Sequence, residues 1–158
     1  MVVEIIKLIL YTLLPFLELR FSIPWGILNG MDVWVVFLVA VITNIILGIA
    51  LYPLLDLIIQ IVEKIKFIER IYKYYVVKTQ KKIHNYVEKY GDIGLALFIS
   101  VPLPGSGVYS GALAAYLLGL SYRKFIIASV IGVLIAGVIV TIVTISGNSA
   151  FQIFVKGV

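Results

Sequence analysis

The sequence contains no cysteine and only one histidine, His84. Without a thiol, the chain has no disulfide bond, no thiolate metal site and no cysteine nucleophile. The sequence also lacks a nucleophile–base arrangement, a metal-ligand spacing and a phosphate-loop signature. We therefore expect a protein that is not an enzyme and that holds neither a metal ion nor a cofactor.

Charged side chains are scarce as well. They make up 13% of the 158 residues, and hydrophobic residues make up 62%, whereas soluble domains have about 25% and about 45–50%. A domain of this length has too much surface for its volume to bury so many apolar side chains. Disordered chains are polar and rich in charge, so disorder is excluded too. The composition predicts a single membrane domain, residues 1–158, that crosses the cell membrane more than once.

Three long segments carry no charge. They are 23, 30 and 31 residues long: Val33–Leu55, Ile93–Tyr122 and Phe125–Val155. A helix needs about 20 apolar residues to span the hydrocarbon core, so each segment is long enough to be embedded. Residues 1–30 are also apolar but contain four charged side chains. A cleaved signal peptide is the alternative there, although Glu4 lies at its start and no small-x-small cleavage site follows the apolar run.

Most of the basic residues lie in one segment, Glu63–Asp92, which holds eight of the thirteen. The positive-inside rule places such a segment in the cytoplasm. Its less polar residues recur at helical spacing, which is typical of a helix lying at the level of the lipid headgroups. We predict that residues 63–92 form a basic amphipathic cytoplasmic linker that contacts membrane lipids. No nucleic-acid partner is expected, and His84 is expected to face water.

The uncharged segment Ile93–Tyr122 is too short to cross the membrane twice. Basic residues flank both of its ends, so both ends should be cytoplasmic. Two full crossings need about 40 helical residues and a turn. A re-entrant hairpin fits instead, because the prolines and glycines of residues 102–107 can form a turn inside the membrane. The alternative is one tilted helix with a proline kink.

When the sequence is shifted by 89 residues, turn and helix-cap residues of the N-terminal segment align with those of the segment around residues 102–122. Turn proline, turn glycine and helix N-cap then coincide: Pro15 with Pro104, Gly30 with Gly119, and Asp32 with Ser121. In the first copy, Pro15 and Pro24 are expected to bracket the turn. The long helix after each hairpin runs in the opposite direction, because one ends and the other begins at basic residues.

The predicted architecture is therefore an all-α integral membrane protein with an inverted-topology repeat. Residues 1–62 form the first repeat and residues 93–158 the second, and each half is a re-entrant helical hairpin plus a transmembrane helix. The side of the membrane that holds the N-terminus is left open. Inverted repeats with interrupted helices are a transporter pattern, with the binding site near the middle of the membrane.

Glu18 and Arg20 are the main candidates for a substrate or ion site, because ionisable groups embedded in a membrane are costly and usually functional. Arg20 would bind an anion, and Glu18 would be its counter-ion or a proton carrier. Two residues this close do not share a helix face, so they could meet only in an irregular turn or each face the opposite hairpin. The alternative places both side chains at the outer interface.

The second candidate cluster is the turn that contains Pro104, Gly105, Ser106 and Gly107, with Tyr109 after it. A glycine-rich break before a helix exposes backbone N–H groups to a phosphate or carboxylate. Close helix packing through small residues is the alternative.

Two single residues complete the set of candidates. Asn44 lies near the centre of an apolar span, where an amide either joins helices by a hydrogen bond or binds a ligand. Arg123 marks the membrane interface or binds a lipid headgroup.

These residues resemble those of a known family. Pro15-x-x-Glu18-x-Arg20-x-x-Ile23-Pro24, Asn44, and the run Pro102–Gly107 ahead of Gly111 are similar to motifs of the small multidrug export protein family. That family is distantly similar to the DedA/VTT membrane proteins. The wider resemblance implies two opposed re-entrant hairpins and movement of polyprenyl-phosphate or phospholipid across a bilayer.

Together, the residues and the resemblance predict a DedA-like transporter that moves an amphiphilic or anionic substrate, such as a polyprenyl-phosphate lipid, through a midplane site between the hairpins. Two full spans enclose little volume, so we expect a homodimer. One alternative is a small multidrug exporter of lipophilic cations coupled to protons. Another is a non-transporting membrane scaffold that binds lipids.

Overall fold

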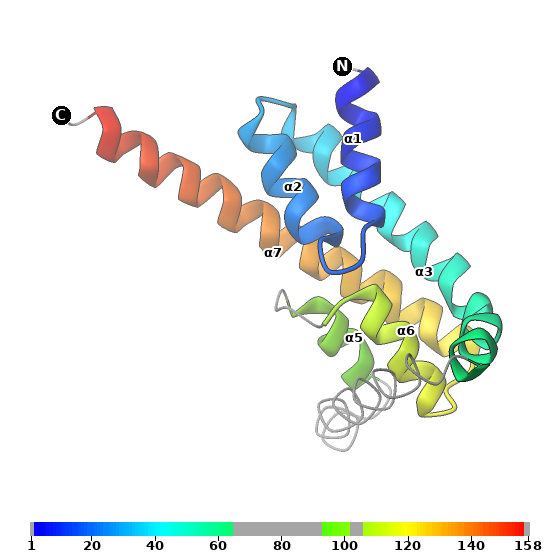
Figure 1. The fold of residues 1–158 in the computed structure, drawn as a ribbon. Coiled ribbons are helices and arrows are strands. Elements are labelled where there is room, and N and C mark those ends of the chain that lie inside the picture. The colour runs from blue at the N-terminus through cyan, green and yellow to red at the C-terminus, as the bar shows by residue number, and fades with distance from the viewer. Residues whose placement is uncertain (1, 65–92, 102–105, 157–158) are drawn as a thin grey trace. The chain divides into compact units, whose positions relative to one another are not determined.

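A computed structural model describes residues 2–64, 93–101 and 106–156. These residues form six helices and contain no strand (Figure 1). The helices are α1 (Val2–Leu13), α2 (Glu18–Leu28), α3 (Val33–Lys64), α5 (Ile93–Ser100), α6 (Val108–Leu117) and α7 (Tyr122–Lys156). The predicted all-α class is thus confirmed for the described residues. From residue 65 onward, the predicted linker, with His84, lies outside them.

Two of the helices are long and apolar enough to cross a membrane. The qualifying stretches are Val33–Leu55 of α3 and Tyr122–Gly147 of α7. The first coincides with an uncharged segment of the sequence, and the second overlaps the uncharged segment Phe125–Val155. Large apolar side chains are exposed at every fourth position of α3, at Trp34, Leu38, Ile42 and Ile46. Such a stripe is unfavourable in water and suits contact with lipid.

The other four helices are too short to span a bilayer. The longest of them, α1, has 12 residues, and at 1.5 Å per residue it is about 18 Å long, against about 30 Å for the hydrocarbon core. They pack in pairs, α1 against α2 and α5 against α6. The N-terminal segment is not one continuous helix, because α1 ends at Leu13 before α2 begins. The segment that starts at Ile93 is not continuous either, because α5 ends at Ser100 before α6 begins.

The chain divides into two compact units, and the first comprises Met1–Asn44 with Leu134–Val158. Glycine allows its helices to approach closely. A Cβ atom at Gly26 would lie 2.7 Å from Val36 Cγ2 and 3.1 Å from Leu8 Cδ1, so α2 is in contact with both α1 and α3. A Cβ atom at Gly137 would lie 2.8 Å from Val41 Cγ2, which places α7 of this unit directly on α3.

The second unit comprises Ile45–Val133. Here α5 and α6 meet where a Cβ atom at Gly111 would lie 2.6 Å from Ile99 Cγ1. An aromatic cluster joins α3 to the start of α7. The ring of Tyr52 stacks on Phe125, with ring centroids 4.9 Å apart, and its hydroxyl donates a hydrogen bond to the carbonyl of Leu120.

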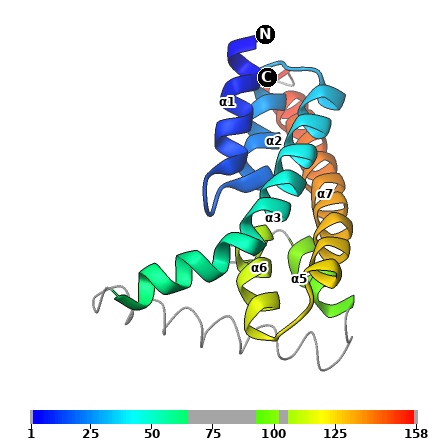
Figure 2. The same ribbon diagram turned by 90° about the vertical axis from the view of Figure 1, so that its right-hand side faces the viewer.

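Pro53 lies inside α3, and the structure compensates for the hydrogen bond that it removes. A proline has no N–H, so the carbonyl four residues earlier, that of Ile49, has no helical donor. The hydroxyl of Tyr122 donates a hydrogen bond to this carbonyl over 3.1 Å. Figure 2 shows α3 changing direction toward its C-terminal end, as a proline inside a helix leads one to expect.

The turns after α2 and α6 have the same local structure, 89 residues apart. Gly30 has φ +80° and Gly119 has φ +65°, a region that glycine adopts at low cost. The same three backbone hydrogen bonds close both turns: Asn29 N to Trp25 O, Gly30 N to Ile27 O and Met31 N to Gly26 O in the first, and Leu118 N to Ala114 O, Gly119 N to Tyr116 O and Leu120 N to Ala115 O in the second.

The predicted N-caps also follow these turns. Asp32 Oδ1 accepts hydrogen bonds from the N–H groups of Trp34 and Val35, each over 3.0 Å. Ser121 Oγ accepts one from the N–H of Lys124 over 3.5 Å. The offset of 89 residues found in the sequence therefore describes local structure as well as residue type.

One local prediction was wrong. Pro24 was expected to close the first turn, but it is the seventh residue of α2, which continues to Leu28. The turn itself lies between Leu13 and Glu18, near Pro15. An interior proline removes one helical hydrogen bond, here to the carbonyl of Arg20, and α2 continues because it is packed against α1.

Candidate functional site

The turn between α1 and α2 is strained at two residues that are not glycine. Phe16 has φ +75° and Glu18 has φ +46°, and each such conformation costs about 1–2 kcal/mol for a residue with a Cβ atom. Backbone N–H groups of Leu17 and Glu18 donate hydrogen bonds to the carbonyl of Leu14, each over 3.2 Å. Glu18 is the first residue of α2, and strain of this kind is concentrated at functional sites.

Glu18 and Arg20 meet in this turn. Glu18 Oε2 lies 4.0 Å from Arg20 Nη1, and the side chains are only 4% and 14% exposed. Two unit charges at this separation attract each other by about 1 kcal/mol in water and about 4 kcal/mol near a protein surface. Of the two arrangements predicted for this pair, direct contact is the one found. The positive φ of Glu18 makes the start of α2 irregular, as that prediction required.

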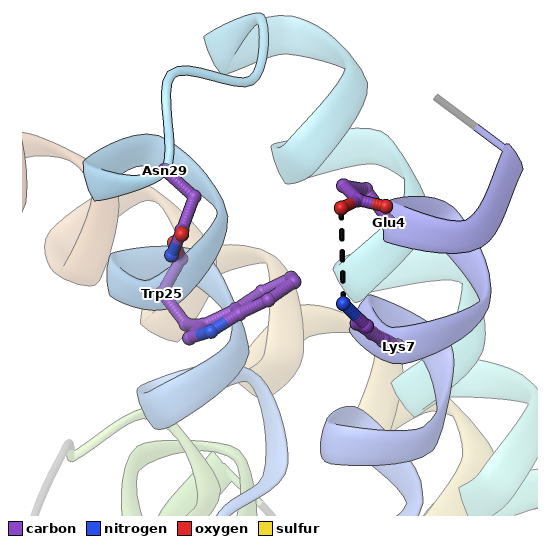
Figure 3. A network of polar contacts seen from close by, with 4 residues as sticks. All are labelled: Glu4, Lys7, Trp25 and Asn29. Carbon is purple, nitrogen blue, oxygen red and sulfur yellow. Dashed lines mark hydrogen bonds and ion pairs between the residues drawn. The ribbon is translucent and has the colours of Figure 1, made fainter.

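A second ion pair on the same hairpin provides a contrast (Figure 3). Glu4 Oε1 lies 3.8 Å from Lys7 Nζ on α1, but these side chains are 40% and 48% exposed. Exposed pairs of this kind contribute little to stability. Trp25 extends from α2 toward α1, and its ring lies 4.9 Å from that of Tyr11. The hairpin thus carries one ordinary surface ion pair and one buried ion pair.

Sequence reasoning missed two buried hydroxyl groups in this hairpin. Thr12 on α1 and Ser22 on α2 are both fully buried, and Thr12 Oγ1 lies 2.7 Å from Ser22 Oγ. A signal for them was present, because they are the only serine and threonine in residues 1–28. Hydroxyl groups in an apolar interface need partners, and these two groups partner each other.

The second predicted cluster is described only in part. Pro104 and Gly105 lie outside the described residues. Ser106 is buried, and its hydroxyl donates a hydrogen bond to the carbonyl of Val101 over 2.6 Å. Gly107 has φ +119° and ψ −169°, a region essentially restricted to glycine. Tyr109 is half-buried on α6.

Asn44 is fully buried on α3. Neither its Oδ1 nor its Nδ2 has a hydrogen-bond partner among the described residues, so the expected hydrogen bond between helices is not found. A buried polar group without a partner costs about 1–3 kcal/mol. Arg123 is exposed in the first turn of α7, a position compatible with the membrane interface that was predicted for it.

The structure therefore brings together one predicted pair, Glu18 and Arg20, in the first unit. Asn44 belongs to the same unit, and Ser106, Gly107, Tyr109 and Arg123 belong to the second. A common site for the two turns stays a prediction. Within the described ranges, no group of three acidic or histidine side chains is placed to hold a metal ion.

The family model described as "Putative small multi-drug export protein" matches residues 18–139, which is more than three quarters of the chain. The match begins at Glu18, at the end of the first turn, and includes the second turn. Comparison with curated proteins and with solved structures gave no match. The predicted resemblance to the export family is confirmed, whereas no finding shows the wider likeness to the DedA/VTT proteins. With two apolar helices of sufficient length, the chain is a membrane protein, and it belongs to the small multi-drug export protein family.

Proposed function

We propose that the chain is a multi-pass cell-membrane transporter that exports an amphiphilic anion, such as a polyprenyl-phosphate lipid, together with a proton. The observation that carries this proposal is the buried pair in which Glu18 Oε2 lies 4.0 Å from Arg20 Nη1. A membrane protein keeps such a pair in its interior at a cost, and embedded ionisable groups mark substrate or proton pathways.

The charge of the pair favours an anion over a cation. Arginine stays protonated in proteins, whereas a carboxylate can be neutralised by one proton. When Glu18 takes up a proton, Arg20 is left with a positive charge that an anionic headgroup can balance. The anion and the proton then enter together without changing the net charge of the site. A cation that binds to Glu18 would instead be repelled by Arg20.

The proposed topology follows from helix length and charge. Helices α1, α2, α5 and α6 are each shorter than the hydrocarbon core, so in this proposal each pair enters and leaves the membrane on one side. Basic residues follow α3 in the sequence, and Arg123 and Lys124 lie at the start of α7. By the positive-inside rule they support a cytoplasmic location for both ends, and in this proposal one half is then inverted relative to the other. Two long helices enclose little volume, so the transporter is proposed to be a homodimer.

Transport by the purified protein in liposomes tests the function. A fluorescent polyprenyl phosphate and a lipophilic phosphonium cation serve as the anionic and cationic probes. Arg20→Gln and Glu18→Gln should each lower transport of the anion by roughly 30-fold or more, because each leaves a buried charge or site without its partner. The matched controls are Lys7→Gln and Glu4→Gln, which remove the exposed pair on α1 and should leave transport within about twofold. Unchanged anion transport in both Arg20→Gln and Glu18→Gln contradicts the proposal.

The description of the family as a multi-drug exporter supports a second candidate, proton-coupled export of lipophilic cations. In that case the protein transports the phosphonium cation. Glu18→Gln should abolish this transport, and Arg20→Gln should retain or increase it because the repelling positive charge is removed. Protein that moves neither probe would fit the non-transporting scaffold that the sequence left open.

Single cysteines test the topology without background, because the chain has none of its own. A cysteine at Val2 and one at Asn29 should react with an impermeant thiol reagent from the same side of the membrane. A pair that reacts from opposite sides would mean that α1 and α2 cross together. Native mass spectrometry of the protein in detergent measures the dimer.

A further inference from the structure

Asn44 lies in the middle of the packed face of α3. Buried residues lie one turn apart along this face: Val36, Ala40, Asn44 and Gly48. The exposed apolar stripe of α3 occupies the other face of the helix. Because Asn44 is fully buried within a single copy of the chain, neither lipid nor a second copy reaches its amide in this conformation.

The amide of Asn44 has two polar atoms, and both lack a hydrogen-bond partner among the described residues. An apolar side chain of the same shape would avoid the cost of these unpaired atoms. A buried water needs two to four polar partners, and the residues one turn away on this face, Ala40 and Gly48, have no polar side chain to hold one. The amide therefore suits a ligand that both donates and accepts hydrogen bonds.

Asn44 lies at about the same depth in the first unit as the pair of Glu18 and Arg20. Helices α2 and α3 run in opposite directions (Figure 2), and they touch where a Cβ atom at Gly26 would lie 2.7 Å from Val36 Cγ2. Glu18 lies eight residues before Gly26, and Asn44 lies eight residues after Val36. At 1.5 Å per residue, both are about 12 Å from the contact in the same direction. The amide and the ion pair are thus carried at one level by two neighbouring helices of the same unit.

We propose that Asn44 binds the headgroup of the substrate and selects a phosphate monoester in its singly protonated form. This inference rests on the proposed function and names the headgroup that the same site takes. Asn44 Nδ2 donates a hydrogen bond to a phosphoryl oxygen, and Oδ1 accepts the hydrogen of the P–OH group, which keeps its proton. The headgroup then has a single negative charge, which Arg20 can balance when Glu18 is protonated.

Other headgroups leave part of the amide unpaired. A phosphodiester accepts hydrogen bonds but has no hydrogen to donate to Oδ1, and a lipophilic phosphonium cation neither donates nor accepts. A buried site that is built to bond a particular group rejects analogues without that group, because its own polar atom then has no partner. We expect a roughly tenfold preference for a monoester over the diester with the same chain, which is about the strength of one hydrogen bond.

Transport in liposomes compares the fluorescent polyprenyl phosphate with its methyl diester. At about pH 5.5 both carry about one negative charge, because the second pKa of a phosphate monoester is about 6. Wild-type protein should move the monoester roughly tenfold faster. Asn44→Leu, which has a similar size, should slow the monoester and reduce the preference to within about twofold. Thr43→Val is the matched control, because it removes a half-buried hydroxyl from the adjacent position of α3 and should keep the preference.

Thermal unfolding in detergent measures binding without transport. Asn44→Leu should unfold at a higher temperature than wild type when no ligand is added, because the unpaired amide is gone. The monoester should raise the unfolding temperature of wild type more than that of Asn44→Leu, since a ligand of the folded state stabilises it. Inorganic phosphate has the same donor and acceptor groups. A rise with inorganic phosphate that Asn44→Leu loses assigns the site to phosphate itself, and a rise with the monoester alone assigns it to the lipid headgroup.

A preference for the monoester that Asn44→Leu loses and Thr43→Val keeps supports the inference. Equal slowing of both esters by Asn44→Leu, or no preference in wild type, overturns it and leaves Asn44 with a structural role. Should Asn44→Leu fail to fold, Asn44→Ala removes the amide with a smaller side chain and should lose the preference likewise. Failure of the proposed function looks different, because neither ester would then be transported while the monoester still stabilises wild type more than Asn44→Leu.

Discussion

The two helix pairs have different residues at corresponding positions just before, or at the start of, their second helix. Glu18 and Gly107 are 89 residues apart in the sequence. Glu18 is the first residue of α2, Gly107 directly precedes α6, and each has a positive φ. Phe16, the other residue of the first turn with positive φ, aligns with Gly105 in the sequence. The second half uses glycine where the first half uses an aromatic ring and a carboxylate.

This difference separates the backbone conformation of a turn from the side chains that it carries. Glycine adopts a positive φ at little cost, whereas a side chain there stores about 1–3 kcal/mol of strain. In the first turn, the strained residue Glu18 is buried against Arg20. In the second, the side chain of Ser106 is bound to the backbone carbonyl of Val101. At the first of these positions a buried, charged side chain is kept in spite of its backbone strain, and at the second a glycine has a positive φ without a side chain.

Replacing Glu18 with the residue found in the second turn should have the largest effect. Glu18→Gly and Glu18→Ala both remove the carboxylate, so both should lower anion transport in liposomes to background. They differ in backbone strain alone, and Glu18→Gly should therefore be more stable than Glu18→Ala by about 1 kcal/mol. Thermal unfolding in detergent measures this difference. Equal stability would mean that the positive φ carries no cost, and retained transport would remove the distinction between the turns.

The reverse exchange is predicted to affect folding. Gly107→Ala places a Cβ atom in a backbone region essentially restricted to glycine and should destabilise the protein by about 1–3 kcal/mol. The transport rate per folded molecule should stay within about twofold. Gly119→Asn is the control, because φ +65° at that position is tolerated by asparagine. A folded and stable Gly107→Ala protein that no longer transports would assign chemistry to the second turn as well.

The smallest expected difference concerns the N-caps after the two hairpins. Asp32 accepts two hydrogen bonds of 3.0 Å, and Ser121 accepts one of 3.5 Å. Asp32→Ala should lower stability by about 1 kcal/mol, and Ser121→Ala by roughly half of that or less. Unfolding in denaturant compares the two variants. A larger loss for Ser121→Ala would show that the caps are not equivalent parts of the two halves.

Local signals in the sequence predicted the turns and helix N-caps after α2 and α6. The turn glycines, Gly30 and Gly119, and the N-caps, Asp32 and Ser121, lie where they were expected, because each depends on the residue itself and its immediate neighbours. The uncharged runs likewise predicted the long helices α3 and α7. Pro24 was misplaced because its effect depends on whether packing holds the helix around it, which the sequence does not reveal.

The candidate site was predictable in its charges but not in its hydroxyl groups. Glu18 and Arg20 are conspicuous because charge is rare in an apolar segment. Thr12 and Ser22 carry no charge, and they meet only because α1 packs against α2. Asn44 was predicted as a candidate because a polar side chain is rare in an apolar span. Its lack of a hydrogen-bond partner among the described residues depends on the packing of α3, which the sequence does not show.

The proline inside α3 has a mechanical consequence. Pro53 makes the helix easier to bend at that point, and the phenol of Tyr122 holds the carbonyl of Ile49 that the proline leaves without a helical donor. The part of α3 beyond Pro53 leads into the sequence segment richest in basic residues. The contacts of Tyr52 with Phe125 and Leu120, together with the hydrogen bond from Tyr122 to Ile49, hold α3 against the start of α7 just before Pro53. Bending at Pro53 would therefore move the C-terminal end of α3 without displacing the start of α7.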